Sequence, residues 1–102
     1  MKKVLLTSIL AFATPVLAAD TLEDFQSNRP ICEGKKSKNW DNCYAEWKVT
    51  KKLKKSTGWV RGERYIGEWD AGLPNGKGWF YGKYGDVYKG DWKANKRDGQ
   101  GE

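Results

Sequence analysis

The distribution of apolar residues divides the chain into two parts. Residues 4–12 form an apolar run behind Lys2 and Lys3, and small residues follow up to Ala18. This order is typical of a secretory signal peptide that is cleaved after Ala18. The alternative is an uncleaved anchor, but a membrane-spanning helix needs about 20 apolar residues. We therefore expect residues 1–18 to be a signal peptide and the protein to be exported, to the periplasm or the extracellular space.

Beyond residue 18 the apolar positions predict short strands. Residues 44–50 are rich in β-branched and aromatic side chains, which favours a strand. Between residues 65 and 69, two rings and a glycine alternate with Ile66 and Glu68, so they lie on one face of a pleated strand. A tight turn is predicted at residues 85–86, because Gly followed by Asp suits positive φ. A second turn is predicted at residues 73–76, where Pro, Asn and Gly stand in favoured places.

The segments in front of these strands are short and polar. Residues 21–25 predict one helical turn capped by Thr21, and residues 34–39 predict a surface loop. Residues 51–58 are rich in lysine and predict an exposed turn. This basic cluster has two interpretations. It binds an anionic partner, or it is a solvated hairpin tip whose lysines prevent sheet-to-sheet aggregation.

An internal repeat accounts for the C-terminal part of the chain. Residues 65–69 and 88–92 share the pattern of ring, glycine and ring at a separation of 23 residues. When residues 62–79 are laid over residues 85–102 at that offset, seven of 18 positions are identical. Each period predicts a β-hairpin, and the glycine leaves space for a ring from the adjacent hairpin. Successive hairpins would then stack as a ladder of Tyr and Trp.

This pattern resembles the MORN repeat, as found in small secreted bacterial proteins. Asn95 stands where the pattern has glycine, and Asn also tolerates the left-handed conformation. The resemblance implies an all-β fold, a single-layer stack of β-hairpins behind a short disulfide-tied N-terminal segment. The positions that fill the pattern are Tyr65, Gly67, Trp69, Gly72, Gly76 and Gly78 in the first copy, and Tyr88, Gly90, Trp92, Gly99 and Gly101 in the second.

The chain is thus predicted to contain four segments. Residues 1–18 are the signal peptide, residues 19–43 an N-terminal segment with a disulfide loop, residues 44–61 a degenerate first hairpin, and residues 62–102 the MORN-like repeats. The sequence stops where a further strand would begin. We therefore expect either an incomplete last hairpin or a truncated product.

The composition changes the picture of the core. The part after residue 18 holds all six Trp, all five Tyr and all 12 Gly, but only eight Leu, Ile and Val, so the core must be built from rings. A chain of this size buries only about 60% of its unfolded surface. Cys32 and Cys43, in an oxidising compartment, predict a disulfide that contributes about 3 kcal/mol. A zinc site is excluded because the chain has no His and no second Cys pair.

Charge and reactive groups argue against several functions. Removal of residues 1–18 lowers the net charge from +6 to +4, which is modest for tight nucleic-acid binding with about six or more phosphate contacts. Without His and with both cysteines paired, only carboxylates could catalyse a reaction. The best placed, Glu68 and Asp91, are copies of one repeat position, so a glycosidase pair is the weaker explanation. We expect no enzyme, no metal, no small-molecule cofactor and no nucleic-acid partner.

Two functions remain open. In the first, an aromatic and basic sheet face binds a protein partner or an anionic membrane surface, as the resemblance to MORN arrays implies. In the second, exposed Trp59, Trp79 or Trp92 stacks on the sugar rings of a carbohydrate or cell-envelope polymer. Repeat arrays need about three repeats, so we also expect self-association or a protein partner to complete the sheet. The candidate binding surface comprises Lys51, Lys52, Lys54, Lys55, Trp59 and Trp79.

Overall fold

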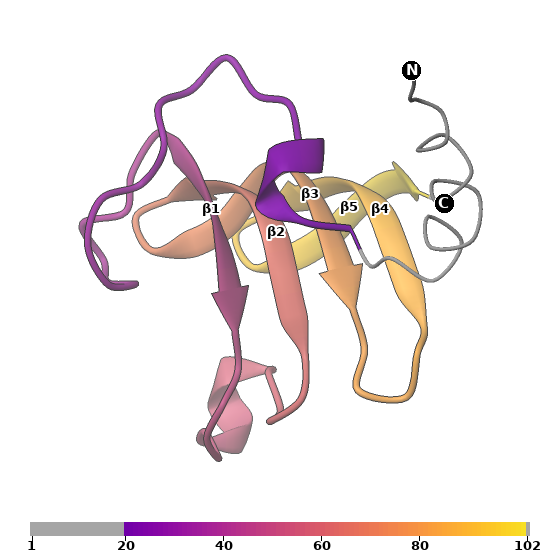
Figure 1. Cartoon of the computed structure of the whole chain (residues 1–102). Coiled ribbons are helices and arrows are strands. Elements are labelled where there is room, and N and C mark those ends of the chain that lie inside the picture. Colours follow the sequence, from indigo (N-terminus) through magenta and orange to yellow (C-terminus); the bar gives the residue numbers. More distant parts are fainter. Residues whose placement is uncertain (1–19, 102) are drawn as a thin grey trace, which may run out of the picture.

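The computed structural model describes residues 20–101, and the expected signal peptide lies outside this range. The chain forms one open antiparallel sheet with the strand order β1-β2-β3-β4-β5 (Figure 1). The predicted all-β fold, a single layer of hairpins, is confirmed. Two short 3-10 turns, η2 (Leu22–Asp24) and η3 (Lys55–Thr57), are the only helical segments among residues 20–101. The strands are β1 (Cys43–Lys48), β2 (Arg64–Asp70), β3 (Leu73–Tyr81), β4 (Val87–Lys93) and β5 (Lys96–Gly101).

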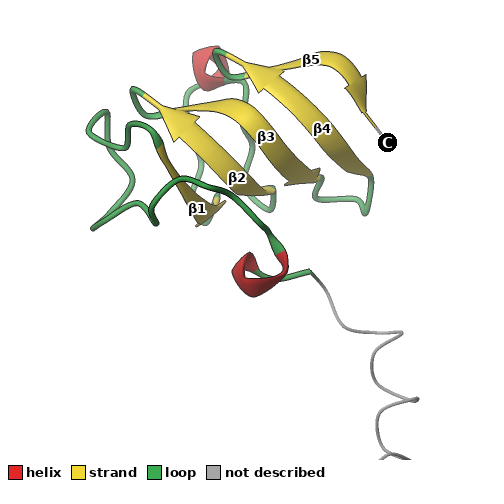
Figure 2. Ribbon diagram, turned by 90° about the horizontal axis from the view of Figure 1, so that it is seen from above, coloured by secondary structure: helices red, strands yellow, loops and turns green. Residues whose placement is uncertain are grey.

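Different segments cover the two faces of the sheet. Figure 2 shows η2 on one side of the sheet and η3 on the other. Phe25, which follows η2, packs against Tyr44 and Trp79 with ring centroids 6.0 and 5.1 Å apart. Trp59, which follows η3, packs against Tyr65 on the opposite face at 6.2 Å. We call the face of Trp79 the outer face and the face of Tyr65 the core face.

Two-residue turns join the strands of each repeat hairpin. Ala71 and Gly72 join β2 to β3 with φ angles of 51° and 79°, and Ala94 and Asn95 join β4 to β5 with φ angles of 48° and 76°. Positive φ at both central residues is typical of turns that match the twist of the paired strands. Asn95 therefore adopts the left-handed conformation that was expected at its position.

The prediction of a turn at residues 73–76 is wrong. These residues belong to β3, and the register between β2 and β3 shifts opposite Glu68. Gly76 has a φ of 103° in this bulge, and Glu68 Oε1 accepts the backbone N–H of Lys77 at 2.9 Å. A glycine is favoured here because its φ is positive. The chain reversal itself lies at Ala71 and Gly72, directly before β3.

The first hairpin also differs from the prediction. β1 pairs with β2 from Cys43 opposite Trp69 to Lys48 opposite Arg64, so this hairpin does not close within residues 44–61. The connection between the two strands contains η3. It is closed at its base by two backbone hydrogen bonds, in which Val49 N–H donates to Glu63 O and Gly62 N–H donates to Val49 O, each at 2.9 Å.

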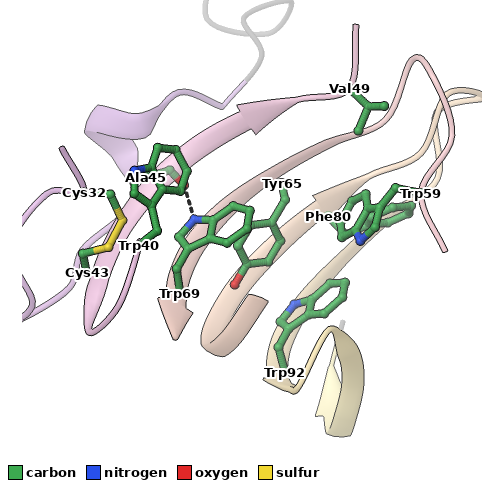
Figure 3. Packing of buried hydrophobic residues seen from close by; sticks show 10 residues of the cluster. All are labelled: Cys32, Trp40, Cys43, Ala45, Val49, Trp59, Tyr65, Trp69, Phe80 and Trp92. Atoms are coloured by element: carbon green, nitrogen blue, oxygen red, sulfur yellow. Dashed lines mark hydrogen bonds between the residues drawn. A yellow bond between two sulfur atoms is a disulfide. The ribbon is translucent and has the colours of Figure 1, made fainter. Parts of the chain in front are cut away.

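Aromatic rings fill the core face, as Figure 3 shows. Tyr65 and Trp69 are both 0% exposed, and the centroid of Tyr65 lies 5.1 Å from those of Trp69 and of Trp92 in the next repeat. The Tyr65 hydroxyl donates to Glu68 O at 2.9 Å. A Cβ atom at Gly78 would overlap the Tyr65 ring. A Cβ atom at Gly67, the glycine between the two rings, would lie 2.6 Å from Tyr65 Oη. The ladder is therefore present, although the ring that these glycines accommodate belongs to the same hairpin and not to the adjacent one.

The predicted disulfide between Cys32 and Cys43 is present, with a Cα separation of 4.9 Å. The loop that it closes packs on the β2–β3 turn, where Gly72 N–H donates to Trp40 O at 2.8 Å. Trp40 is buried and meets Trp69 edge to face at 5.1 Å. The loop predicted to lie on the surface therefore also covers one end of the core face.

The N-terminal segment of the described chain is held on the outer face by polar contacts. Asp20 Oδ2 accepts the Tyr81 hydroxyl at 2.6 Å and pairs with Lys89 Nζ at 2.9 Å. The hydrogen bonds from Tyr81 and Lys89 lower the pKa of Asp20, and burial together with the same hydrogen bond raises the pKa of Tyr81. Farther along, Arg29 pairs with Asp70 at 3.3 Å.

Candidate functional site

Two loops meet at one end of the sheet. In an up-and-down sheet, alternate connections lie at the same end, so the β1–β2 connection neighbours the β3–β4 connection (Figure 1). The loops touch each other, since a Cβ atom at Gly62 would lie 2.9 Å from Lys83 Cβ. We call residues 48–63 and residues 82–86 together the basic end.

The basic end carries the whole net positive charge of the described chain. It contains seven cations against two carboxylates, whereas the rest of residues 20–101 contains ten cations and ten carboxylates. The net charge of +5 is thus concentrated in two loops that lie side by side. The cations of the basic end are Lys48, Lys51, Lys52, Lys54, Lys55, Arg61 and Lys83, and its carboxylates are Glu63 and Asp86.

A cavity of about 470 Å³ opens within the basic end. Its walls combine cations with apolar groups. Among residues 20–101, none of these cations forms an ion pair. Ion pairs are formed instead by Arg29 of the N-terminal segment and by Arg64, Lys77 and Lys89 of the sheet. The cationic wall is formed by Lys52, Lys55, Arg61 and Lys83, and the apolar wall by Leu53, Trp59 and Val60.

Exposed apolar side chains accompany these charges. Tyr84 is 88% exposed at the tip of the β3–β4 connection, and Val60 is 47% exposed beside the cavity. The Nζ atom of Lys83 lies 5.1 Å from the centroid of the Tyr84 ring. An aromatic side chain with a polar tip suits the boundary between water and an apolar phase. The basic end therefore offers both charge and an amphipathic ring to a partner.

The structure brings some of the predicted site residues together and separates others. The four predicted lysines, at positions 51, 52, 54 and 55, are all exposed in the basic end. Trp59 was expected to be exposed, but it is only 6% exposed, because η3 directs it into the core, where it stacks on Trp92 at 6.0 Å. Trp79 lies on the outer face, away from the predicted lysines' loop.

The rings proposed for sugar stacking are already occupied by protein groups. Trp59 and Trp92 are buried in the ladder. Trp79 is contacted by the edge of Phe25 at 5.1 Å, and Lys89 Nζ lies 4.3 Å from its centroid. The aromatic sheet face is likewise the protein's own core, so the accessible basic surface is the loop end and not a sheet face.

Three residues of the basic end were missed by the sequence argument, namely Arg61, Lys83 and Tyr84. They lie outside the lysine-rich segment, and Lys83 and Tyr84 stand about 30 positions after it in the sequence. The signal that could have found Lys83 and Tyr84 is the order of the strands. Once consecutive hairpins are predicted, the first and third connections must share one end of the sheet.

Glu68 and Asp91, the two carboxylates weighed as a glycosidase pair, each contact other groups of the protein. Glu68 Oε2 accepts the Ser27 hydroxyl at 2.7 Å, and Glu68 Oε1 accepts the Lys77 N–H at the bulge. Asp91, the repeat copy, pairs with Lys77 Nζ at 2.6 Å, and this contact raises the pKa of Lys77. Both side chains are thus engaged in holding neighbouring strands.

Comparison with known proteins agrees with the repeat. The family model of the MORN repeat matches residues 65–87 and 88–102, the two copies found at a 23-residue offset. A MORN repeat is therefore present in the chain. No curated protein and no solved structure shows a significant match. Within residues 20–101, no helix has the length and apolar character needed to cross a membrane.

Proposed function

We propose that the protein is an exported, non-enzymatic MORN-repeat module that docks on an anionic membrane surface through the basic end. The observation that carries this proposal is the concentration of the entire net charge of +5 in two adjacent loops. A MORN repeat is consistent with a protein-binding or membrane-binding module. The disulfide suits an oxidising, exported environment.

The physics of such docking follows from the charges and from Tyr84. Each lysine or arginine close to an anionic bilayer contributes about 1 kcal/mol, and the attraction fades within a Debye length. The seven cations of the basic end supply enough attraction for reversible binding. Tyr84, which is almost fully exposed, would enter the headgroup region, where aromatic rings with a polar tip are favoured. The rigid sheet keeps both loops in place.

The test is co-sedimentation with vesicles of phosphatidylglycerol and phosphatidylcholine, compared with phosphatidylcholine alone. We expect binding to the anionic vesicles only. A variant with Lys51, Lys52, Lys54 and Lys55 changed to Ala should bind at least about tenfold more weakly. Its matched control has the exposed residues Lys35, Lys38, Lys93 and Lys96 changed to Ala, which removes the same charge from elsewhere. Equal losses in both variants would contradict the proposed site.

A second candidate is a protein partner, or a second copy, that pairs with β5. Strand β1 lies at one edge of the sheet, and residues 30–32 hydrogen-bond to Tyr44 and so cover part of this edge. Among residues 20–101, β5 pairs with β4 alone, and an unpaired edge is a template for another strand. Sedimentation velocity at micromolar concentration tests this candidate, and a monomer at all concentrations would exclude a second copy.

A further inference from the structure

Lys36 differs from the other lysines of the disulfide loop. Its Nζ atom lies 4.7 Å from the ring centroid of Trp47 and 5.4 Å from that of Trp69. Among residues 20–101 no carboxylate forms an ion pair with it. Its side chain is exposed, like those of Lys35 and Lys38, although partial desolvation lowers its pKa. The ammonium group is thus held in place without an anion of its own.

The same ammonium borders a separate, mainly apolar pocket of about 340 Å³. Its polar side chains are largely engaged. Asn95 Oδ1 accepts the Trp59 Nε1–H at 2.7 Å, and Asn95 Nδ2 donates to Thr57 O at 3.0 Å. The Thr57 hydroxyl donates to Lys54 O at 2.8 Å. The apolar lining comes from Trp47, Leu53, Trp59, Leu73 and Pro74.

The loops that line this pocket are anchored to the rest of the fold. The disulfide loop is fixed by its bridge and lies so close to the β2–β3 turn that a Cβ atom at Gly72 would lie 2.8 Å from Lys38 Cα. The η3 segment is fixed by the side chain of Asn95 in the β4–β5 turn. A pocket whose walls are already in place loses little conformational freedom when a ligand enters.

We propose that this pocket binds a small apolar or aromatic carboxylate. The carboxylate would pair with Lys36, and the apolar body would lie against Trp47, Leu53 and Leu73. One cation matches one negative charge, and the apolar lining disfavours a strongly hydrated dianion such as phosphate. The site is distinct from the cavity of the basic end, although Leu53 and Trp59 contribute to both.

Two sources could supply this chemistry, a fatty acid or the C-terminal residue of a peptide. The probes are octanoate against 1-octanol, and N-acetyl-phenylalanine against its amide, so that each acid has a neutral partner with the same body. Binding is followed by chemical shift changes in amide NMR spectra of the full chain with its disulfide intact. At least one acid should bind saturably, about tenfold more tightly than its neutral partner. Octanoate as the better probe would indicate a fatty acid, and N-acetyl-phenylalanine a peptide terminus.

Variants locate the site. Lys36→Gln should remove the preference for the acid, whereas Lys38→Gln, an exposed lysine on the same loop, should leave it unchanged. Leu73→Ser changes a side chain that is 41% exposed and should weaken the acid and its neutral partner alike. The absence of saturable binding, or an equal effect of Lys36→Gln and Lys38→Gln, would overturn the proposal.

Discussion

Alanine in place of Gly78 tests whether the ring ladder holds the sheet together. The backbone of Gly78 does not lie in the left-handed region, so alanine is acceptable to the main chain. Its Cβ atom, however, would overlap Oη, Cε1 and Cζ of Tyr65. The ring would have to move by about 1 Å to restore an ordinary carbon contact. Such a shift is opposed on two sides, because Trp69 and Trp92 each lie 5.1 Å away.

The expected cost follows from these contacts. Overpacking of a filled core costs about 1–3 kcal/mol and sometimes more. Loss of the hydrogen bond from the Tyr65 hydroxyl to Glu68 O adds about 1 kcal/mol. We therefore expect Gly78→Ala to remove about 3 kcal/mol or more, a large share of the stability of about 4–12 kcal/mol typical for this length.

The second repeat provides a matched control at Gly101. A Cβ atom there would overlap Tyr88, but the Tyr88 ring is only partly buried. Where Tyr65 has a second Trp, Tyr88 has the guanidinium of Arg97, whose Cζ atom lies 5.0 Å from the ring centroid. Tyr88 can therefore move, and Gly101→Ala should cost only about 1 kcal/mol. Urea unfolding followed by tryptophan fluorescence measures both. Equal losses for the two variants would refute the ladder as the source of stability.

Three further predictions concern the disulfide, the pH dependence and the second turn. Replacing Cys32 and Cys43 by Ser should lower the free energy of unfolding by about 3 kcal/mol, measured by urea unfolding, and an unchanged midpoint would contradict this. Burial raises the pKa of Tyr65, so the contribution of this residue to stability should be constant below pH about 10 and be lost above it, because the unfolded tyrosine ionises first. Tyr65→Phe should reduce the alkaline decline in the free energy of unfolding, measured by urea unfolding at pH about 8 to 11, and an unchanged decline would contradict this. Asn95→Gly keeps the turn but removes both side-chain hydrogen bonds to the η3 segment. The substitution should lower the free energy of unfolding by about 1–2 kcal/mol, measured by thermal unfolding. An unchanged free energy would show that Asn95 serves the turn alone.

The repeat made much of the fold predictable from the sequence. Strands β2 and β4 follow from the alternation of ring and glycine, and the buried ladder follows from the scarcity of aliphatic residues. The turn at residues 73–76 was misplaced because Pro, Asn and Gly are equally suited to a bulge. Local composition cannot separate the two, since the difference depends on pairing with Glu68 across the sheet.

The candidate site was only partly predictable. The lysines and Arg61 of the β1–β2 connection stand close together in the sequence, whereas Lys83 joins them only through the topology of the sheet. Trp59 belongs to no repeat, so no periodicity assigns it to a face. Its burial depends on the path of a long connection, which is fixed by the side chain of Asn95, 36 positions away in the sequence.

The most direct test of the central claim is to find which part of the molecule faces a membrane. Amide NMR signals would be recorded with anionic bilayers that contain a nitroxide-labelled lipid, and again after reduction of the nitroxide. The account predicts the strongest signal loss at residues 51–55 and 60–61 and at Lys83 and Tyr84, and little at the β2–β3 turn of the opposite end. The β4–β5 turn is left out of the comparison, because the side chain of Asn95 contacts the η3 segment. Strongest loss at residues 71–72 or in the disulfide loop, or none at all, would contradict it.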